Sequence, residues 1–287
     1  MKLRNIKKKL PWWVKIVSKL LLSRIRFIGY SFWKSIGVFE HGRMNNPEYA
    51  AKIFNDHYKL VNKPKKGFVC MEMGNGDSLS TAINATVHGA KKIYLVDVGF
   101  FANTDINIYH ELMEYLNSQG YVINNKFSDY REMLNKCNTE YLTDGIKSYR
   151  NIPDNSIDFV FSQAVLEHIY QNEFEDTMMQ IFRILKRGGQ CSHVIDLKDH
   201  LDYSINNLRF KEKIWESKIF RTSGFYTNRL RKHEMIKIFG RIGFKVQIVD
   251  EKKWDNVPVA KNKLAKPYRN MKDEELLTSY FTVILSK

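Results

Sequence analysis

An acid and two glycines stand close together in the first third of the sequence, and a second acid follows soon after. Glu72, Gly74 and Gly76 come directly after an apolar run, and Asp97 ends the next one. Glycine lacks a Cβ, so it can adopt positive φ and let backbone N–H groups approach a ligand closely. Carboxylates accept hydrogen bonds from hydroxyl and cationic groups. The pattern therefore predicts the start of a nucleotide-binding site with acids beside the ligand.

These residues require a strand, a turn, a helix and a second strand to position them. The apolar runs 68–71 and 93–96 predict two parallel strands, and the apolar spacing between them predicts a helix over 78–88, closed by Gly89. In an open parallel sheet, ligands bind outside the carboxyl ends of the strands. The acids and the glycine turn should therefore converge on one crevice.

A dinucleotide is disfavoured as the ligand of this crevice. A dinucleotide site has the pattern G-x-G-x-x-G, in which the third glycine allows close packing of the helix whose N-terminus faces a pyrophosphate. Here Leu79 occupies the third glycine position, and Glu72 and Asp77 would repel a pyrophosphate. A cofactor without phosphates fits better than NAD.

The pattern Glu72-x-Gly74-x-Gly76, followed by an acid after the second strand, resembles motif I of the class I S-adenosylmethionine-dependent methyltransferases. Their cofactor has a cationic amino-acid end, a ribose diol and no phosphate, so acids suit both ends. The resemblance implies that the glycines approach the methionine part, that Glu72 supports the turn and that Asp97 accepts from the ribose hydroxyls. It also implies that Asp144 takes the adenine amino group, although an Asp before a Gly is common in turns without a ligand. The implied cofactor-binding residues are Glu72, Gly74, Asn75, Gly76, Asp77, Ser78, Asp97, Val98, Asp144, Gly145, Ser162 and Gln163.

A second stretch strongly resembles the fourth-strand region of the small-molecule members of this family. Residues 152–161 join a Pro-Asp-Asn-Ser turn to a buried run, after which Ser162 and Gln163 are predicted to emerge at the carboxyl edge. The sequence L-K-x-G-G at 185–189 resembles the turn that the family shows before its fifth strand, here 190–197. The order of these signals matches that of the family.

Three residues at this carboxyl edge are candidates for proton transfer. His168 is predicted at the start of the helix after the fourth strand, and Asp199 and His200 follow the fifth strand. Such groups can deprotonate an acceptor hydroxyl or hold a divalent metal that does so. We predict the first role for all three and do not predict a metal site. A structural histidine and a capped, solvated loop are the alternatives.

Residues 201–231 form an insert before the last helix, where methyltransferases commonly place acceptor-binding elements. Aromatic residues and arginines are interleaved along it. Aromatic faces suit sugar rings or lipid, and the guanidinium fork suits phosphate or carboxylate. A packed lid would show many of the same aromatics. The predicted substrate-binding residues are Arg221, Tyr226, Asn228 and Arg229.

The positive charge is concentrated at the N-terminus. The net charge is +15, and residues 1–40 carry ten Lys or Arg against one acid. From Pro11 this extension predicts a basic amphipathic helix with Trp12 and Trp13 near its start. Charges interrupt every apolar run before it reaches the length of a membrane span, and no signal-peptide cleavage site follows. Such a helix can bind an anionic membrane surface or pack on the domain; contact with nucleic acid is less favoured.

The cysteines indicate a reducing compartment. Cys70, Cys137 and Cys191 lie far apart in the sequence and have no metal-binding spacing. We therefore predict three thiols without a disulfide partner. The expected location is the cytoplasm, with peripheral association at the inner face of the membrane as a further expectation.

These signals together predict an α/β fold with a seven-stranded, mostly parallel, doubly wound (Rossmann-like) sheet and an antiparallel last strand. Residues 1–40 would form the helical extension and residues 41–287 the methyltransferase domain. The expected activity is S_N2 methyl transfer from S-adenosylmethionine to a small-molecule acceptor, an oxygen of a sugar or of a phosphorylated or lipid-linked saccharide precursor. This core, extension and insert together resemble bacterial methyltransferases of cell-surface polysaccharide assembly. The alternatives are an RNA or protein methyltransferase, a non-catalytic scaffold and an NAD-dependent sugar-modifying enzyme.

Overall fold

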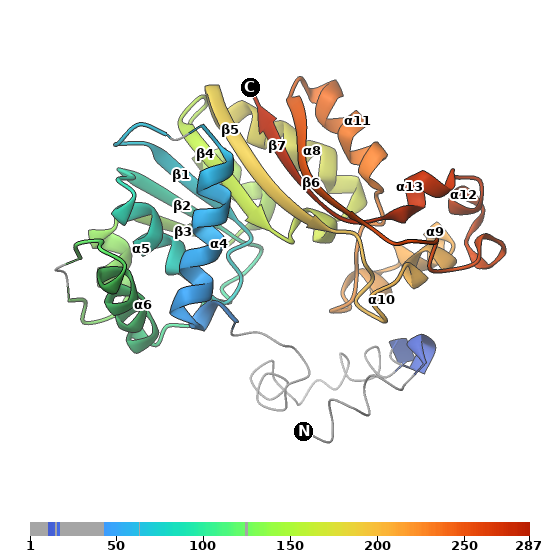
Figure 1. Ribbon diagram of the computed structural model, residues 1–287, viewed down its shortest axis with the longest axis horizontal. Coiled ribbons are helices and arrows are strands. Elements are labelled where there is room, and N and C mark those ends of the chain that lie inside the picture. The colour runs from blue at the N-terminus through green and yellow to red at the C-terminus, as the bar shows by residue number, and fades with distance from the viewer. Residues whose placement is uncertain (1–10, 15, 18–42, 63, 124–125) are drawn as a thin grey trace.

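One sheet organises the fold. The computed structural model describes residues 11–14, 16–17, 43–62, 64–123 and 126–287. The strands follow the order β3-β2-β1-β4-β5-β7-β6, and β7 runs antiparallel to its neighbours while the others are parallel (Figure 1). This confirms the predicted seven-stranded sheet with its antiparallel last strand. The strands are β1 Val69–Met73, β2 Lys92–Val96, β3 Thr139–Leu142, β4 Ile157–Gln163, β5 Leu185–Asp196, β6 Lys245–Lys253 and β7 Thr278–Ser286.

Helices cover both faces of the sheet. On one face, Phe54 packs against Phe159 of β4 in a core that also contains Leu112; on the other, Phe174 and Phe239 belong to the core that contains Val160. Burying each such side chain contributes about 1.5–3 kcal/mol. The α-helices are α4 Pro47–Leu60, α5 Ser80–Val87, α6 Ile106–Ser118, α7 Tyr130–Lys136, α8 Gln171–Ile184, α9 Glu212–Trp215, α10 Lys218–Arg221, α11 Lys232–Ile242, α12 Lys266–Arg269 and α13 Asp273–Leu277. Short 3₁₀ turns are η1 Arg43–Asn45, η2 Gly145–Asn151, η3 Leu166–His168, η4 Asn206–Arg209 and η5 Lys261–Lys263.

The strand order reverses between β1 and β4. From β1 the chain proceeds to β2 and β3 on one side of the sheet, and from β4 it proceeds to β5 on the other side. In open α/β sheets a crevice opens at this point, outside the carboxyl ends of the strands. The glycine turn after β1 and residues 164–168 after β4 flank this crevice.

Some bounds differ from those predicted. The prediction that the helix after β4 begins at Glu167 and His168 is wrong, because these residues lie in η3 and α8 begins only at Gln171. The predicted turn 185–189 lies within β5, since Leu185 already pairs with Ile157 before the register shifts.

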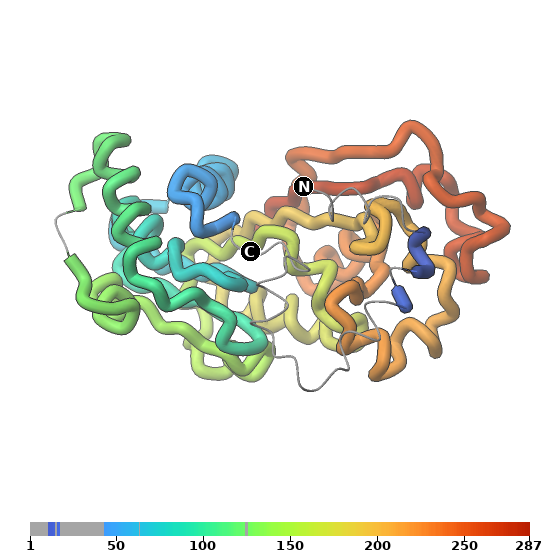
Figure 2. The backbone as a smooth tube through the Cα atoms, turned by 90° about the horizontal axis from the view of Figure 1, so that it is seen from below, coloured from blue at the N-terminus to red at the C-terminus, as the bar shows by residue number. Residues whose placement is uncertain are grey.

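A cap stands beside the sheet and draws on two connections of the chain. The predicted insert contributes Ile205 and Leu208, which pack with Leu264 and Leu276 from the connection between β6 and β7. The N–H of Ala265 also donates to the carbonyl of Leu208 at 2.9 Å. Figure 2 shows the two connections together at one end of the molecule. The sequence did not indicate that residues 254–277 belong to this cap.

Residues 11–14 and 16–17 lie against the cap. Ile16 is buried with Trp215 and Phe225, and the Trp12 ring meets Phe210 edge-on at 6.0 Å between centroids. Figure 2 shows the blue segment beside the orange trace of the insert. For these described residues the structure thus supports packing on the domain; residues 1–10, 15 and 18–42 of the predicted extension lie outside the part of the chain that the structure describes.

Candidate functional site

The glycine turn joins the ends of three strands. Gly74 and Gly76 have φ of 73° and 59°, and their N–H groups donate to the carbonyl of Val96 at 2.7 Å and to Asp97 Oδ2 at 2.8 Å. A Cβ on Gly74 would lie 2.5 Å from Cγ2 of Val165, which follows β4. Only glycine therefore allows the turn to approach the β4 loop this closely.

Asp97 and its neighbours form the second wall of the crevice. Asp97 accepts the N–H of Gly76 through Oδ2 and that of Val98 through Oδ1 at 2.7 Å. Burial raises the pKa of Asp97, and these two hydrogen bonds oppose the rise. The backbone N–H of Gly145 donates to the Asp97 carbonyl, so the predicted residues Asp97, Val98 and Gly145 are contiguous. Val98 is 77% exposed, and its side chain offers an apolar surface to a flat ligand.

Two acceptors at the glycine turn lack donors. Asn75 Oδ1 and Asp77 Oδ2 are buried and have no hydrogen-bond partner among the described residues. A buried acceptor without a hydrogen-bond donor destabilises the fold unless a ligand supplies the donor. They suit the ammonium end of an amino-acid moiety, so the residues present fit S-adenosylmethionine. The buried Glu72 lies behind them in β1, where desolvation raises its pKa to about 7.

Two of the three predicted proton-transfer residues meet. Nε2 of His168 and Nε2 of His200 lie 3.1 Å apart, and the rings are stacked with centroids 4.9 Å apart. Nδ1 of His168 donates to the Tyr226 carbonyl at 2.9 Å, so Nε2 of His168 accepts the proton of His200 Nε2. Desolvation lowers the pKa of His168, although the residue is exposed at the crevice, and so favours its neutral form.

Asp199 is not part of this pair, which corrects the prediction. Its side chain is buried, and Oδ1 accepts the N–H groups of Leu201 and Asp202 at 3.0 and 2.7 Å. Oδ2 accepts the N–H of Asn206. Three backbone donors thus engage the carboxylate, which shapes the loop after β5 and is poorly placed to act as a base.

Ser162 also departs from its prediction. Its side chain is fully buried, and its hydroxyl lies 2.7 Å from His193 Nδ1 on the neighbouring strand, beneath the crevice. Gln163, the next residue, points to the opposite face of the sheet, as alternate strand residues must. Only Gln163 of this predicted pair therefore reaches the carboxyl edge.

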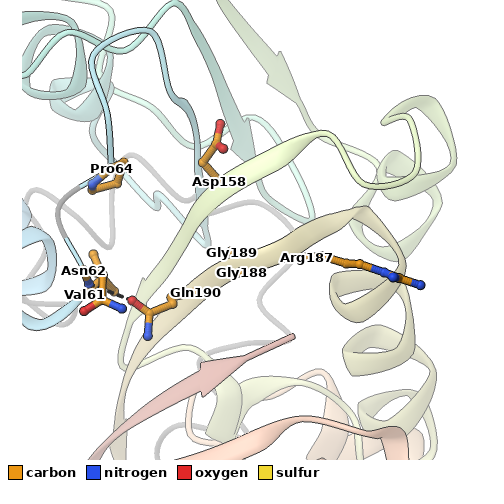
Figure 3. Close-up of a pocket in the computed structure, with 8 residues that line it drawn as sticks. All are labelled: Val61, Asn62, Pro64, Asp158, Arg187, Gly188, Gly189 and Gln190. Atoms are coloured by element: carbon orange, nitrogen blue, oxygen red, sulfur yellow. Dashed lines mark hydrogen bonds between the residues drawn. The ribbon is translucent and has the colours of Figure 1, made fainter.

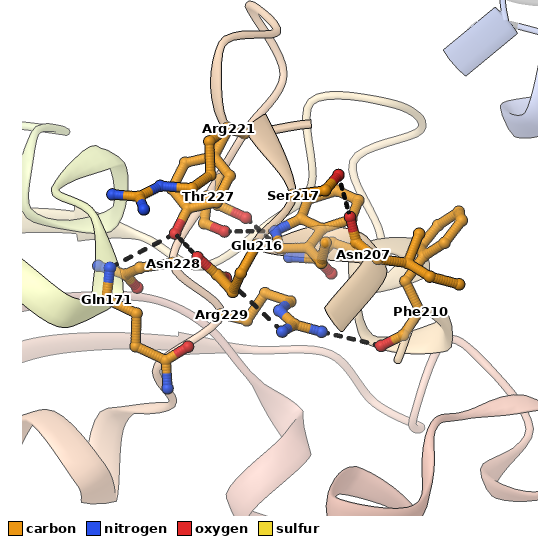
Figure 4. A network of polar contacts seen from close by, with 12 residues as sticks. Gln171, Asn207, Phe210, Glu216, Ser217, Arg221, Thr227, Asn228 and Arg229 are labelled. Carbon is orange, nitrogen blue, oxygen red and sulfur yellow. Dashed lines mark hydrogen bonds and ion pairs between the residues drawn. The ribbon is translucent and has the colours of Figure 1, made fainter. Parts of the chain in front are cut away.

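Three of the predicted substrate-binding side chains are engaged inside the cap, and Figure 4 shows Arg229 there beside Glu216 and Phe210. Asn228 donates to the carbonyls of Leu166 and Ile169, and Tyr226 donates to Glu216 at 2.8 Å. Arg229 is buried, pairs with Glu216 and donates to the Phe210 carbonyl at 2.9 Å. These contacts correct the prediction for Tyr226, Asn228 and Arg229, since they join the insert to itself and to the β4 loop.

Arg221 is placed differently. Its guanidinium lies 3.9 Å from the centre of the Tyr170 ring and donates to Asn172 Oδ1 at 2.9 Å. Tyr170 packs edge-on against Tyr226, whose carbonyl holds His168. Arg221 therefore remains a candidate on the cap beside the histidine pair.

Sequence reasoning missed two buried groups under the crevice. His57 of α4 lies 2.8 Å from Ser192 Oγ through Nδ1 and 3.0 Å from Gln163 Oε1 through Nε2. Glu167 accepts the N–H of Asp196, and burial raises its pKa to about 8. The signal for His57 was a histidine on the apolar face of a helix placed just before the first strand.

A cavity of about 240 Å³ lies elsewhere, among Val61, Asn62, Pro64, Asp158, Arg187, Gly188, Gly189 and Gln190 (Figure 3). These residues stand at the amino ends of β4 and β5, at the opposite edge of the sheet from the glycine turn. The cavity is thus separate from the candidate site.

The described residues contain neither a metal-binding cluster nor a membrane-spanning helix. Within them, no three or more His, Cys, Asp or Glu side chains gather in a way that could hold a metal ion. No described helix is both long enough and apolar enough to cross a membrane. Cys70, Cys137 and Cys191 are buried, free thiols.

A family model described as a methyltransferase domain matches residues 108–192, from α6 into β5. The match contains β4 and His168, whereas the glycine turn precedes it. Together with the sheet topology, it confirms the resemblance to the S-adenosylmethionine-dependent methyltransferases. S-adenosylmethionine is the cofactor that this class implies. No curated protein matches the chain.

Three solved methyltransferase structures are similar to this chain at low sequence identity. Phosphoethanolamine N-methyltransferase 2 of Haemonchus contortus is 14% identical with a TM-score of 0.47, over 82% of this chain and 52% of that one. A methyltransferase of Archaeoglobus fulgidus is 12% identical with a TM-score of 0.48, over 90% of this chain and 100% of that one. One from Mesorhizobium loti is 12% identical with a TM-score of 0.43, over 86% of this chain and 100% of that one. The chain spans about half of the length of the Haemonchus protein.

Proposed function

We propose that this chain is an S-adenosylmethionine-dependent O-methyltransferase acting on a saccharide or on its phosphorylated or lipid-linked precursor. The observation that carries the proposal is the histidine pair, with Nε2 atoms 3.1 Å apart, at the carboxyl edge that also holds the glycine turn. A hydroxyl is a poor nucleophile and needs a base, whereas an already nucleophilic acceptor would need only positioning.

The cofactor supplies a methyl group activated by a sulfonium. The glycine turn and Asp97 would hold it, with Asn75 and Asp77 at the amino-acid end. Because Nε2 of His200 donates to His168, the lone pair of a neutral His200 ring lies on Nδ1. When bound, the cofactor would supply the methyl group and leave as the thioether, and the proton of the acceptor hydroxyl would pass to His200. His168 stabilises the resulting imidazolium through the 3.1 Å contact.

The side chains of the cap fit an acceptor that has a ring and an anionic group. The guanidinium of Arg221 lies over Tyr170, close to the backbone that holds His168. An Arg fork suits a phosphate or a carboxylate, and an exposed aromatic edge suits a sugar ring. We assign Arg221 to the anionic part of the acceptor.

We further propose that the N-terminal extension brings the cap to an anionic membrane surface. Trp12 and Ile16 pack against the cap, while Trp13 is 56% exposed. Interfacial tryptophan and basic side chains favour the headgroup layer. Trp13→Ala should weaken sedimentation of the full chain with phosphatidylglycerol vesicles more than Val122→Ala, a control at another exposed apolar residue. Equal sedimentation of wild type and Trp13→Ala would contradict this proposal.

The acceptor is tested by a methyl-transfer screen with labelled S-adenosylmethionine. The panel holds phosphorylated sugars, polyprenyl-phosphate-linked saccharides, RNA and a protein mixture. Label in an alkali-stable methyl ether of a saccharide is the expected result. Label only in RNA, with binding that weakens steeply with salt, would overturn the saccharide assignment.

A further inference from the structure

We propose that His57 is a positioning residue that directs the amide NH₂ of Gln163 toward the carboxylate of the cofactor's methionine moiety. The inference rests on the proposed function, because it concerns how the same crevice holds its cofactor. It starts from a buried hydrogen-bond chain that runs from Ser192 on β5 through His57 on α4 to Gln163 at the end of β4.

The direction of this chain follows from donor and acceptor chemistry. Oε1 of Gln163 lies 3.0 Å from Nε2 of His57 and can only accept, so Nε2 carries the proton. A neutral imidazole then has its lone pair on Nδ1, which accepts the hydroxyl proton of Ser192 at 2.8 Å. Burial favours the neutral ring, since it lowers the pKa of His57 to about 4. With Oε1 held by His57, the amide of Gln163 turns its NH₂ away from the helix.

The strand register places this NH₂ at the methionine end of the crevice. Glu72 of β1 pairs with Phe161 of β4, so Gln163, the last residue of β4, lies beside the point where β1 ends and the glycine turn begins. The glycine turn is where the resemblance places the methionine moiety. That moiety carries an ammonium and a carboxylate. Asn75 and Asp77 offer orphaned acceptors, which suit the ammonium, and Gln163 offers donors, which suit the carboxylate.

His57 is well built to hold the amide in this orientation. Its side chain is 1% exposed, and its ring packs 5.0 Å from the ring of Phe161. Because both ring nitrogens have partners, rotation of the ring would break two hydrogen bonds in a dry environment. In this arrangement the buried His57 ring holds Oε1 of Gln163.

The test compares three ligands by calorimetry: S-adenosylmethionine, its decarboxylated analogue, which lacks only the carboxylate, and 5′-methylthioadenosine. His57→Phe keeps an aromatic ring and removes both nitrogens. We expect it to weaken S-adenosylmethionine binding about tenfold or more and to leave the decarboxylated analogue and 5′-methylthioadenosine within about twofold of wild type. His88→Phe is the matched control, because His88 also contacts aromatic rings but follows α5 at the opposite edge of the sheet.

A second variant keeps the test decisive if His57→Phe does not fold. Gln163→Glu retains an acceptor for His57 and replaces the donating NH₂ by a carboxylate oxygen. It should weaken S-adenosylmethionine binding far more than binding of the decarboxylated analogue. Equal losses for the two ligands, or no loss, in the folded variant would overturn the inference. Wild-type protein that binds none of the three would instead contradict the proposed function.

Discussion

His168 and His200 face each other with their Nε2 atoms 3.1 Å apart, although they follow different strands of the sheet. β4 and β5 are parallel neighbours, so the segments after their carboxyl ends meet at one edge. The Tyr226 carbonyl fixes the His168 tautomer, and thus makes the cap part of the proton-transfer geometry. The insert therefore supports the pair.

Replacing either member of the pair should reduce turnover. Both His200→Asn and His168→Gln should lower kcat by about 10²–10⁴-fold and leave the Kd of S-adenosylmethionine unchanged, because the base acts on the acceptor. His110→Gln is a suitable control, since His110 bonds the Phe127 carbonyl away from this edge. Steady-state kinetics with the identified acceptor, together with calorimetry, measures both quantities. A kcat within twofold of wild type for both variants would contradict the assigned base.

The pH dependence of the rate follows from the same pair. Desolvation lowers the pKa of His168 below its usual 6.5, so His168 stays neutral and can accept a hydrogen bond at neutral pH. The rate constant for methyl transfer in single-turnover experiments should be flat near neutrality and fall only below pH 6.5. A fall that begins well above this value would mean that another group supplies the base.

Four buried titratable side chains should make the free energy of unfolding highest, and nearly independent of pH, in weakly acidic solution. Burial lowers the pKa of His57 to about 4 and of His193 to about 3, from 6.5, and raises that of Glu72 to about 7 and of Glu167 to about 8, from 4.5. Below pH 6.5 these two histidines are protonated in the unfolded chain but stay neutral in the folded one. They therefore lower the free energy of unfolding as pH falls. Above pH 4.5 the unfolded chain releases protons that the folded glutamates keep, so the glutamates lower stability as pH rises.

These opposing effects offset each other between pH 4.5 and 6.5. Urea unfolding should therefore show little change in free energy there and losses on both sides, about 1.4 kcal/mol per pH unit for each uncompensated group. His57→Phe should make the free energy of unfolding fall as pH rises from 4.5 to 6.5, because the glutamates are then only partly offset, and Glu72→Gln should make it rise over the same range. Variants whose profiles match that of wild type would show that these groups do not set the dependence.

The two turn glycines should differ in their tolerance of alanine. Both have positive φ, which costs an alanine about 1–2 kcal/mol, but only Gly74 also faces a clash, with Val165 Cγ2 at 2.5 Å. A Cβ on Gly76 meets nothing within 4 Å. Gly74→Ala should therefore lower the unfolding free energy and cofactor affinity more than Gly76→Ala. Gly74→Ala with Val165→Ala should recover part of the difference, and equal effects of the two single variants would refute the packing argument.

Arg231 should be the most sensitive arginine of the cap. It is 1% exposed, and its guanidinium donates to the carbonyls of Leu197, Glu275, Leu276 and Thr278. Arg231→Met leaves buried carbonyls without donors, so we expect a loss of about 2–4 kcal/mol in urea unfolding. Arg150→Met, at an exposed position, should change stability by less than about 0.5 kcal/mol. A loss below about 1 kcal/mol for Arg231→Met would contradict this role.

The sheet and the glycine turn could be predicted because their signals are local. Gly74, Gly76 and Asp97 lie next to buried runs, and the structure places them together at the end of β1 and β2. The roles of Asp199 and Asn228 could not be predicted in this way. Whether such a side chain faces a ligand or backbone donors depends on how a loop folds back, as Asp199 does onto Asn206.

The hydrogen bond between His57 and Gln163 could not be predicted from the sequence, for a different reason. The two residues are far apart in the chain and meet only because α4 packs over β4 and β5. Similarly, nothing in residues 254–277 indicated that they pack with Leu208 of the insert. Contacts of this kind depend on tertiary packing, which a periodic pattern within one segment does not contain.

The most direct test of the central claim is calorimetric titration of the full chain with S-adenosylmethionine and, separately, with NAD. The site predicts saturable binding of S-adenosylmethionine with one site per chain, weakened at least tenfold by Asp97→Asn, and no binding of NAD. Folded protein that binds no S-adenosylmethionine would contradict the proposed enzyme and would favour a scaffold that retains the fold without the cofactor.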